Sequence, residues 1–405
     1  MLTQDELEEI ASRMVGVSGN NSLQAGYTYL GQLISHDIVP PTAGRTRYID
    51  KTLSLRSIYG EPADHARYFD VDGRFIVQEK DVQRSETGEA IIAESRNDEN
   101  LIVCQLHRFW QGLHNHLIDA GLVANFDEAR AATIRLFQLI VIEDFLAQLL
   151  TRRVFRFHFE QNQQLLNLAQ GGIPAEFSMA AYRFGHSMVR NVYRLQVDGQ
   201  TFDLVKLMRF GKKLKRKHHI DWRLFFGPDR FIDIAVQRAR GIDPQIAEGM
   251  TTVHRPGGDV NIVEANLKAT ATLPSAMTLI DQIKTEHPEE FRQLDIPRFF
   301  MNLSVFRGLS VSLDRLPLWP YILMEAGAAN SGKRLSGLGS LIVADVLRTC
   351  IAEAPVSVFD HDIYSFEQAV TKLPPAVQNA LSDVTASHPS ARKLTMHQLI
   401  QLVNA

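Results

Sequence analysis

Two short segments of the chain carry polar side chains at a spacing that suits chemistry on a helix. In the run Gly-Gln-Leu-Ile-Ser-His-Asp that starts at Gly31, Gln32 and His36 are four residues apart. On a helix this spacing puts both side chains on one face. Imidazole exchanges its proton near neutral pH, although taken alone such a histidine is more often a satisfied structural residue than a catalyst.

The second segment is Arg96-Asn97-Asp98-Glu99-Asn100, directly before a predicted helix. Asp98 or Asn100 could cap that helix, since acidic and amide side chains are favoured at its positive end. A capping role does not explain Arg96, because a cation is unfavourable beside a helix N-terminus. The helix itself carries a polar stripe that we expect to be mostly structural: His107, Gln111 and His114.

A third segment, Tyr182 to Arg190, holds His186 next to Gly185. Glycine inside a helix costs about 1 kcal/mol relative to alanine, so Gly185 needs a reason. It leaves space in which a flat ligand could press against the helix. Zinc fits poorly, because no further ligand-type side chain stands four residues from His186.

The elements that must position these segments are predicted to be helices. Apolar residues recur every three or four positions along most of the chain, and alternation is confined to one modest strand candidate, 72–78. The expected helices cover 27–38, 100–122, 127–152, 176–195, 201–209, 232–240, 277–285, 296–311, 318–325, 337–352 and 393–404. The expected loops are 39–47, 60–66, 80–95, 241–276 and 326–336. The fold class is therefore expected to be mainly α, with very little β.

The composition is that of an ordinary globular protein, with 45% hydrophobic and 22% charged residues among 405. A formal net charge of -3 gives no bulk electrostatic reason to bind nucleic acid or an anionic membrane. The two cysteines, Cys104 and Cys350, cannot build a disulfide framework. The acidic N-terminus is unlike a Sec signal peptide, and charged and amide residues interrupt the most apolar stretch, 133–150. We expect a cytoplasmic protein without a membrane span, with non-classical export left open.

One dense basic run occupies residues 209–219. No aromatic residues alternate with its cations, and no second basic element accompanies it. A solvated surface is therefore favoured over a nucleic-acid or lipid patch. Whether the run guides an anionic substrate is left open.

Together and in this order, the three segments resemble those of the animal-type haem peroxidase superfamily, specifically its bacterial members. The Gly-Gln-x-x-x-His-Asp run resembles the distal-histidine helix of that family. Arg96 to Leu101 is similar to its distal-arginine segment, and Tyr182 to Arg190 to its proximal-histidine helix. Weaker matches extend the resemblance from about residue 20 to about residue 352: Ser57-Ile58-Tyr59-Gly60, Ile220-Asp221-Trp222-Arg223, Met301-Asn302-Leu303, Arg307-Gly308 and Arg334 to Ser340.

The resemblance implies a role for each matching residue. His186 would be the proximal ligand of the iron of haem b, and Asn302 matches the residue that holds its other ring nitrogen. His36 matches the base that takes a proton from peroxide, and Arg96 the cation that stabilises the developing negative charge. The remaining matches are Gln32 for distal water or a halide, and Arg183 and Arg307 for the haem propionates.

Three departures from the family pattern change these expectations. Ser35 stands where many relatives have an acid that forms an ester to haem, so only Glu99 could provide such a link. Ser54 and Arg56 stand where calcium ligands are wanted, so we expect no calcium, with Arg56 as a substitute partner for Asp37. Arg307 follows Asn302 by five residues instead of about three, which weakens its match.

The resemblance implies a peroxidase that uses hydrogen peroxide or an organic hydroperoxide to oxidise a small organic or halide substrate. The main alternative is a haem-dependent fatty-acid dioxygenase or a hydroperoxide-rearranging enzyme or peroxygenase. Relatives of the dioxygenase type place a tyrosine three residues before the proximal histidine, where this chain has Arg183. Tyr182 is one position off, although four residues before His186 it would still share the face of His186 on an α-helix. A second alternative is a haem-binding protein without turnover.

The proposed site also bears on the domain organisation. His36, Arg96, His186 and Asn302 would all have to meet at one haem, so a domain boundary between 36 and 302 would cut the site. We therefore expect one domain over residues 1–405, with a core at about 20–352 and a helical C-terminal extension at 353–405. The oligomeric state and the reducing substrate are not predicted.

Overall fold

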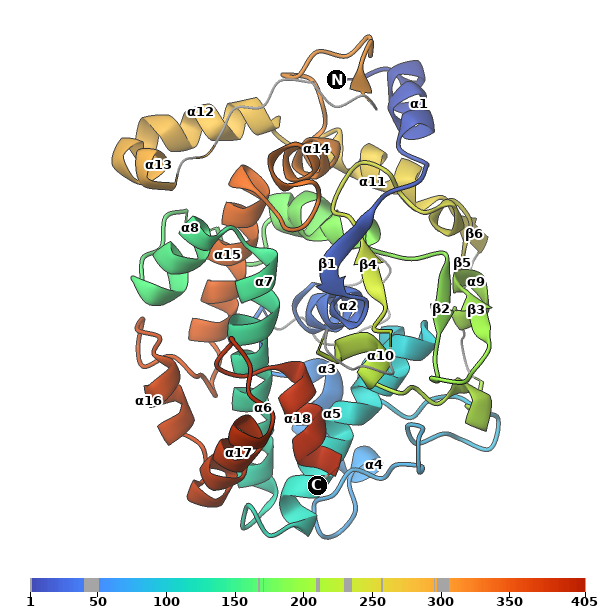
Figure 1. Cartoon of the computed structure of the whole chain (residues 1–405), viewed down its shortest axis with the longest axis vertical. Helices are drawn as coiled ribbons and strands as arrows, with labels where there is room; N and C mark the ends of the chain where they lie inside the picture. Colours follow the sequence, from blue (N-terminus) through green and yellow to red (C-terminus); the bar gives the residue numbers. More distant parts are fainter. Residues whose placement is uncertain are drawn as a thin grey trace.

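The helix α2 (Gly26–Ile38) lies at the centre of the molecule, surrounded by the other long helices (Figure 1). This architecture is that of a computed structural model of the chain. It describes residues 2–39, 51–166, 168–169, 171–208, 212–228, 235–255, 258–294, 296 and 306–404. The structure is mainly helical, as predicted, with a few short strands. In these ranges no helix is long and apolar enough to cross a membrane.

The remaining elements vary widely in length. The longer helices are α1 (Gln4–Arg13), α5 (Leu101–Asp119), α6 (Phe126–Ile140), α11 (Ile262–Thr270), α12 (Ala276–Glu286), α14 (Leu318–Asn330), α15 (Gly337–Ala352), α17 (Pro375–Ser387) and α18 (Met396–Asn404). The shorter ones are α3 (Arg56–Tyr59), α4 (His65–Tyr68), α7 (Ala147–Leu149), α8 (Arg152–Phe155), α9 (Leu204–Leu207), α10 (Arg223–Phe226), α13 (Pro288–Leu294) and α16 (Phe366–Thr371). The 3-10 helices are η1 (Pro62–Asp64), η2 (Ser95–Asp98), η6 (Ala181–His186), η7 (Arg216–His218) and η8 (Glu248–Met250), and the π-helices are η3 (Val141–Leu146), η4 (Arg156–Glu160) and η5 (Glu176–Ala180).

Side-chain caps fix the starts of α5 and α6. The amide oxygen of Asn100 accepts the N–H of Ile102 at 2.8 Å, and that of Asn125 accepts the N–H of Glu128 at 3.0 Å. Each cap satisfies an N–H group that the first helical turn leaves unpaired. Because α5 packs against both α2 and α6, its capped start holds the preceding η2 beside α2.

The predicted helix 127–152 is formed by α6, η3 and α7 in succession, with a π-helix in its middle. Asp144 in that π-helix is fully buried. Its carboxylate accepts the hydroxyl of Tyr27 at 2.7 Å and the N–H of Met396 at 2.6 Å, and pairs with Arg392 at 2.7 Å. These contacts join α2 to the start of α18, so the C-terminal residues pack onto the central helices.

The described residues form three two-stranded antiparallel sheets. β1 (Asn20–Gln24) pairs with β4 (Arg238–Arg240), β2 (Val192–Arg194) with β3 (Thr201–Asp203), and β5 (Val253–Arg255) with β6 (Gly258–Val260). None of these strands was predicted. The predicted strand 72–78 contributes only isolated bridges, from Phe75 to Phe69 and from Val77 to Val82.

Several predicted elements are wrong in type or extent. The segment 176–195 is helical only to His186 and continues into β2, because a hairpin with β3 captures the β-branched and aromatic residues there. The segments 201–209 and 232–240 likewise contain β3 and β4. Conversely, α11 lies inside the predicted loop 241–276. The predicted helix 296–311 lies mostly outside the described residues, and its described end forms turns.

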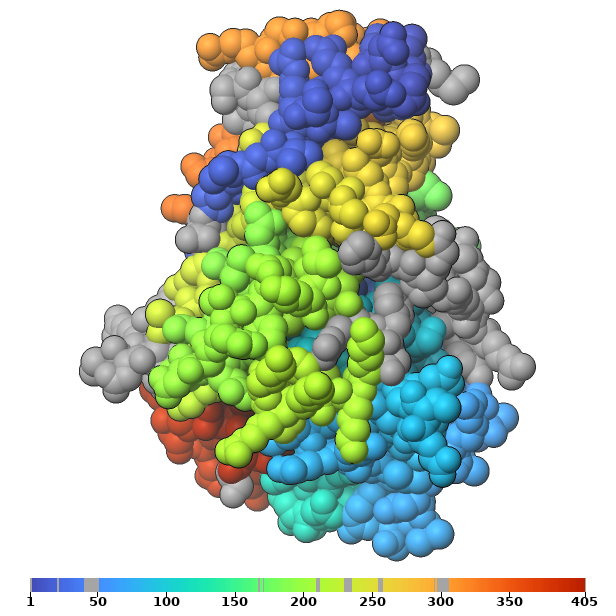
Figure 2. Space-filling view, turned by 90° about the vertical axis from the view of Figure 1, so that its right-hand side faces the viewer, coloured from blue at the N-terminus to red at the C-terminus, as the bar shows by residue number. Residues whose placement is uncertain are grey.

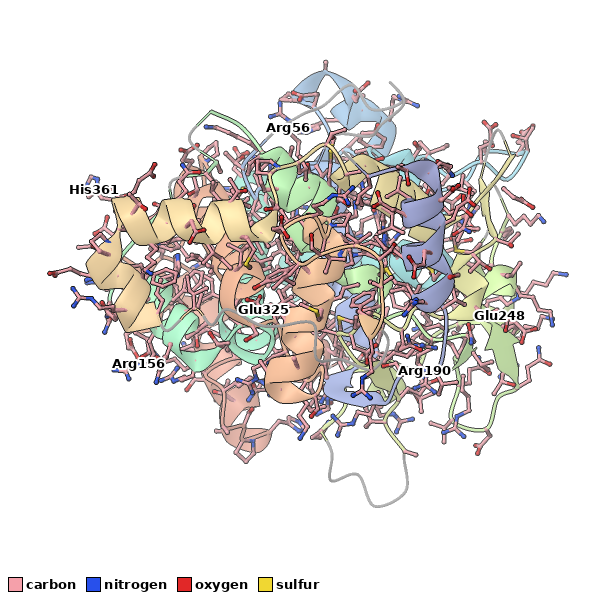
Figure 3. The ribbon with its side chains drawn as sticks, turned by 90° about the horizontal axis from the view of Figure 1, so that it is seen from above. Arg56, Arg156, Arg190, Glu248, Glu325 and His361 are labelled. Carbon is pink, nitrogen blue, oxygen red and sulfur yellow. The ribbon has the colours of Figure 1, made fainter. Side chains whose placement is uncertain are left out.

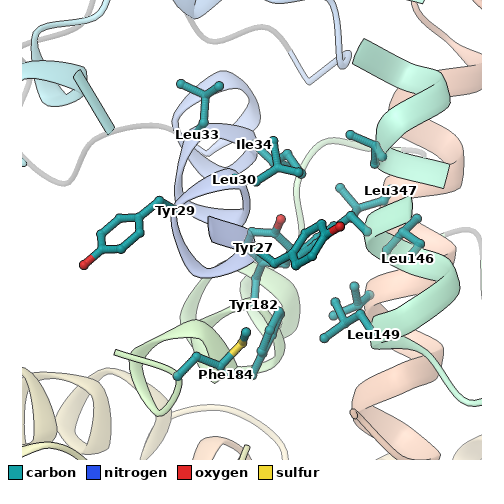
Figure 4. Packing of buried hydrophobic residues seen from close by; sticks show 14 of the residues in the cluster. Tyr27, Tyr29, Leu30, Leu33, Ile34, Leu146, Leu149, Tyr182, Phe184 and Leu347 are labelled. Atoms are coloured by element: carbon teal, nitrogen blue, oxygen red, sulfur yellow. The ribbon is translucent and has the colours of Figure 1, made fainter. Parts of the chain in front are cut away.

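Buried apolar residues form one cluster that extends from Ile10 to Leu402. Figure 4 shows its part around α2, where Leu30 and Ile34 face the helix that carries Leu146, and Tyr182 packs from below. A single domain over residues 1–405 remains a prediction, as does the boundary near residue 353.

One buried carboxylate connects two helices of this core. Glu325 on α14 lies inside the molecule, whereas Arg156, Glu248 and His361 lie toward its edge (Figure 3). Its two oxygens accept the N–H groups of Leu338 at 3.0 Å and Gly339 at 3.2 Å, in the first turn of α15. Glu325 thus caps the neighbouring helix, and burial raises the pKa of its carboxyl to about 7.

Candidate functional site

One face of α2 is only partly buried, although the helix is central. Gln32 and His36 are partly exposed, as are Gly31 and Ser35, whereas Leu33 is fully buried. Residues four apart on a helix lie on the same side. The structure therefore confirms that Gln32 and His36 share a face, as their spacing predicted.

The imidazole of His36 is held by an asparagine from η2. Its Nδ1 lies 2.8 Å from Oδ1 of Asn97, and Nδ2 of Asn97 lies 2.9 Å from Nδ1 of His107 on α5. With this amide orientation, Nδ1–H of His36 donates to Asn97, and Asn97 donates to His107. The unprotonated nitrogen of His36, the one able to accept a proton, is then Nε2.

His107 can accept the hydrogen bond that Asn97 donates. It is fully buried, and burial together with the Arg108 cation lowers the pKa of its imidazole to about 3. At neutral pH the ring is therefore uncharged, and its Nδ1 accepts while Nε2 carries the hydrogen. The neighbouring His114 has the structural role expected of it, between the hydroxyl of Tyr59 at 3.0 Å and the carbonyl of Gly73 at 2.9 Å.

Arg96 is anchored at the end of the helix that carries His36. Its guanidinium donates to the carbonyls of His36 and Val39, both at 3.0 Å, and pairs with Glu94 at 2.9 Å. Cations are favoured beside the C-terminal carbonyls of a helix. Nε of Arg96 is buried and has no hydrogen-bond partner among the described residues. The predicted distal pair, His36 and Arg96, is thus brought together.

Asp37, near the end of α2, binds the backbone of residues 54–57. Its carboxylate accepts three backbone N–H groups, from Ser54 at 3.1 Å, Leu55 at 2.9 Å and Ser57 at 2.8 Å. Leu55 has a left-handed backbone with φ of 54°, a conformation that costs a leucine about 1 kcal/mol or more. Arg56, expected to be a partner of Asp37, forms an ion pair with Glu61. The absence of calcium remains a prediction.

The second predicted histidine, His186, ends the 3-10 helix η6. Its Nδ1 lies 2.7 Å from the side-chain amide of Asn266 on α11. Asn266 is buried, and it was missed because its helix was expected to be a loop. A polar residue at helical spacing among Ile262, Val263, Leu267 and Thr270 was the available signal. Asn302, the residue predicted for this role, lies outside the described residues.

The backbone around His186 is fixed from α14. The indole N–H of Trp319 donates to the carbonyl of Arg183 at 3.1 Å, and Nε of Arg183 donates to the carbonyl of Ser178 at 2.8 Å. A 3-10 helix has three residues per turn, so residues three apart eclipse each other. Arg183 therefore shares the side of His186, whereas Tyr182 does not.

The distal and proximal segments are in direct contact, since η6 packs against α2. A Cβ atom built on Gly31 would lie 3.9 Å from the hydroxyl of Tyr182 and 3.3 Å from the ring of Phe145. A Cβ atom built on Gly185 would meet no atom of the described residues within 4 Å. As far as the described residues go, open space therefore lies beside His186, on a segment that touches the helix of His36.

This arrangement fits a haem. The contact to Asn266 occupies Nδ1 of His186, so a bond to iron would be made by Nε2. Iron on Nε2 leaves the proton on Nδ1, and the amide of Asn266 would then present its oxygen to that N–H. The open space beside Gly185 is where a flat group could approach the ligand.

Two further predicted site residues, Glu99 and Arg307, lie on separate segments of the chain. Glu99 follows η2 directly and is partly buried. Arg307 is exposed, and its backbone carbonyl accepts from Arg13 of α1 at 2.7 Å. The described contacts of Arg307 do not bring it to His186.

Comparison with known proteins shows what this chain is similar to. A family model described as "Animal haem peroxidase" matches residues 66–260, a range that includes Arg96 and His186 but not His36. Sequence comparison with curated proteins finds no match. Among solved structures, the chain is similar to peroxidase A of Dictyostelium discoideum, with a TM-score of 0.61 and 14% identity over 93% of this chain and 90% of that one.

Fatty acid alpha-dioxygenases are similar to the same degree. For the Oryza sativa enzyme the TM-score is 0.60 at 12% identity, over 98% of this chain and 80% of that one. For the Arabidopsis thaliana enzyme it is 0.62 at 14% identity, over 95% and 74%. At such identities the likeness shows the fold, which peroxidases and dioxygenases share. The match over residues 66–260 identifies an animal haem peroxidase domain in that part of the chain.

Proposed function

We propose that the protein is a haem-dependent peroxidase that uses hydrogen peroxide or an organic hydroperoxide to oxidise a small organic or halide substrate. The observation that carries this proposal is the hydrogen-bonded chain from His36 through Asn97 to His107. It orients one imidazole with a defined proton acceptor, as a general base requires. A bound haem supplies the reduction of the peroxide and the oxidation of the substrate.

In this proposal His36 handles the proton of the peroxide. Nε2 accepts it from the oxygen that carries it and returns it to the oxygen that leaves. Asn97 keeps the hydrogen on Nδ1 throughout, so each transfer uses the same ring nitrogen. Gln32, one turn earlier on the same face of α2, would hold water or a halide beside that nitrogen.

Arg96 stabilises the negative charge that develops on the departing oxygen. Its contacts with the carbonyls of His36 and Val39 fix the guanidinium in advance, so no reorganisation accompanies the reaction. The N–H at Nε has no partner among the described residues and is available for this interaction. Glu94 reduces the net charge but leaves the donors in place.

On the other side, His186 would hold the iron of haem b, with Asn266 as the acceptor for its Nδ1–H. An acceptor there raises the basicity of the ligand. Arg183, on the side of His186, is proposed to pair with a propionate, whereas Arg307 has weaker support because of its exposed position. One ester link through Glu99 is proposed as an option that mass spectrometry of the haem-loaded protein decides.

The main alternative is a fatty-acid dioxygenase, which shares the fold and needs a tyrosine beside the haem. Tyr182 is the nearest candidate in sequence. Its ring stacks on Phe177 with centroids 4.6 Å apart and its hydroxyl faces Gly31 of α2, within the packing shown in Figure 4. Since η6 is a 3-10 helix, Tyr182 lies off the side of His186. This geometry favours the peroxidase.

One experiment separates these activities. The haem-loaded protein is given either peroxide with phenols or halides, or palmitic and linoleic acids with dissolved oxygen and no peroxide. We expect substrate oxidation only in the first case. Oxygen uptake in the second case, lost in Tyr182→Phe, would establish the dioxygenase. Haem binding without either activity would indicate the non-catalytic alternative.

A further inference from the structure

A pocket of about 520 Å3 lies away from His36 and His186, between the loop of residues 78–88 and the lysine-rich segment of residues 212–215. This volume is within the range of sites for small molecules, ~300–1,000 Å3. In Figure 2 the segment that starts at residue 212, drawn in yellow-green, lies against the light-blue segment that contains the loop.

The net charge of the lining is positive. Lys212, Lys213 and Lys215 contribute three exposed ammonium groups, and Glu86 is the one acid among the described lining residues. The remaining cation, Arg84, pairs with two carboxylates, those of Asp81 and Asp98, so this buried group carries one net negative charge. Three lysines against Glu86 and this group leave a net charge of +1, which comes from the exposed lysines.

Arg84 forms the buried floor of this arrangement, with 2% of its side chain exposed. Its guanidinium binds the carboxylate of Asp98 through two N–H groups, at 2.7 and 2.9 Å, and that of Asp81 at 2.8 and 3.1 Å. Two such pairs of parallel hydrogen bonds hold the guanidinium in one orientation. Arg84 therefore fixes the pocket wall and leaves the lysines to bind a ligand.

The lysine segment is also held in place. The N–H of Leu214, between Lys213 and Lys215, donates to the buried carboxylate of Asp81 at 2.9 Å. The N–H of Lys215 lies 3.2 Å from Nδ1 of His218, which is buried. The backbone of the segment is thus fastened on both sides, so the three ammonium groups extend from a fixed support.

This support is shared with the distal segment. Asp98, which binds Arg84, follows Asn97 in η2, and Asn97 binds His36. The pocket and the candidate catalytic site are therefore built on the two sides of one short helix.

We propose that this pocket binds a small molecule with two or more oxyanion groups, carboxylate or phosphate. Each lysine presents up to three N–H donors to such groups. The hydroxyls of Ser85 and Thr87 line the same pocket 2.8 Å apart; one O–H donates to the other hydroxyl, and the second O–H can donate to a ligand. The site is distinct from the one proposed for peroxide, and binding to it does not depend on haem.

Calorimetric titration of the full-length, haem-loaded protein tests this inference. Citrate and pyrophosphate are the probes, and acetate is the monovalent control. Citrate or pyrophosphate should bind, more weakly as salt increases, and acetate should bind at least tenfold more weakly. The comparison of citrate with pyrophosphate identifies the preferred oxyanion.

Two matched triple variants locate the site. Lys212→Gln with Lys213→Gln and Lys215→Gln should weaken binding at least tenfold. The control, Lys268→Gln with Lys284→Gln and Lys333→Gln, removes the same charge from three exposed lysines elsewhere and should bind as the wild type does. Glu86→Gln removes the acid of the lining and should tighten binding two- to fivefold.

Equal affinity in both triple variants would overturn the proposal, as would the absence of binding by citrate and pyrophosphate. Binding of anionic vesicles or oligonucleotides, lost only in the pocket variant and without binding of the small anions, would instead assign the lysines to a macromolecular surface. These readouts measure binding directly, so they stand even where the protein shows no peroxidase activity.

Discussion

His36 and Asn97 are separated by 61 positions in the sequence, yet Nδ1 of the imidazole lies 2.8 Å from Oδ1 of the amide. The other end of the same amide contacts His107 at 2.9 Å. One asparagine thereby joins α2, η2 and α5. Because both ends of the amide are engaged, it cannot rotate without exchanging both interactions.

Replacement of Asn97 by alanine should therefore disturb His36 without removing it. We expect haem to bind as in the wild type and the reaction with peroxide to slow about 10–100-fold, a part of the ~10²–10⁴-fold that a general base contributes. Stopped-flow absorption measures the rate, and ¹⁵N NMR of the imidazole shows which nitrogen carries the hydrogen. Asn97→Asp retains an acceptor and should recover most of the rate. A wild-type tautomer and rate in Asn97→Ala would remove Asn97 from the mechanism.

Asn266 should act through His186 alone. Asn266→Asp places an anionic acceptor at Nδ1, which should make the ligand more electron-donating and lower the iron reduction potential. Asn266→Leu, of similar size, should raise it. Spectroelectrochemistry measures the iron reduction potential of the two variants. Equal potentials would show that Asn266 does not contact His186 in the haem-loaded protein. His186→Ala should instead lose haem or its fifth ligand.

The buried Glu325 predicts how stability changes with pH. Its pKa is raised from 4.5 to about 7, so the folded protein retains a proton that the unfolded chain loses. The stabilisation that this provides is complete below about pH 4.5 and is lost as the pH rises through 7, with up to about 1.4 kcal/mol per pH unit in between. Urea unfolding of Glu325→Gln should lack this slope. An unchanged slope would place its origin at another group.

His107 predicts a dependence of the opposite sign. Burial lowers the pKa of its imidazole to about 3, so near pH 6.5 the unfolded chain binds a proton that the folded protein does not bind. Stability should therefore fall as the pH decreases from 6.5 toward 3. His107→Gln retains polarity without a titrating ring and should show a shallower acid limb in thermal unfolding. An acid limb as steep as that of the wild type would place its origin at another group.

The sequence predicted α2, which carries His36, from its apolar periodicity, and α5, which follows Arg96, from its periodicity and its candidate cap Asn100, because these are local features. α2 and α5 begin and end close to the predicted residues, and Arg96 stood out because local capping could not explain its charge. The partners of these residues could not be read in the same way. Asn97 and Asn266 have their roles only because α5 and α11 pack beside η2 and η6.

The proximal segment shows where periodicity misleads. Apolar spacing does not distinguish an α-helix from a π-helix followed by a 3-10 helix, and the difference moves Tyr182 away from the side of His186. The strands of residues 192–194 and 201–203 were missed because three residues are too few to show alternation. Each of these strands is stabilised by its pairing with the other strand, which neither segment shows by itself.

The central claim is that His36 is the base of a haem peroxidase. Its most direct test is the rate at which hydrogen peroxide changes the Soret absorption of the haem-loaded protein, in the wild type and in His36→Gln. We predict a Soret band in both proteins and a rate at least about 100-fold lower in the variant, the lower bound for loss of a general base. A wild type without a Soret band, or a variant that reacts as fast as the wild type, would contradict it.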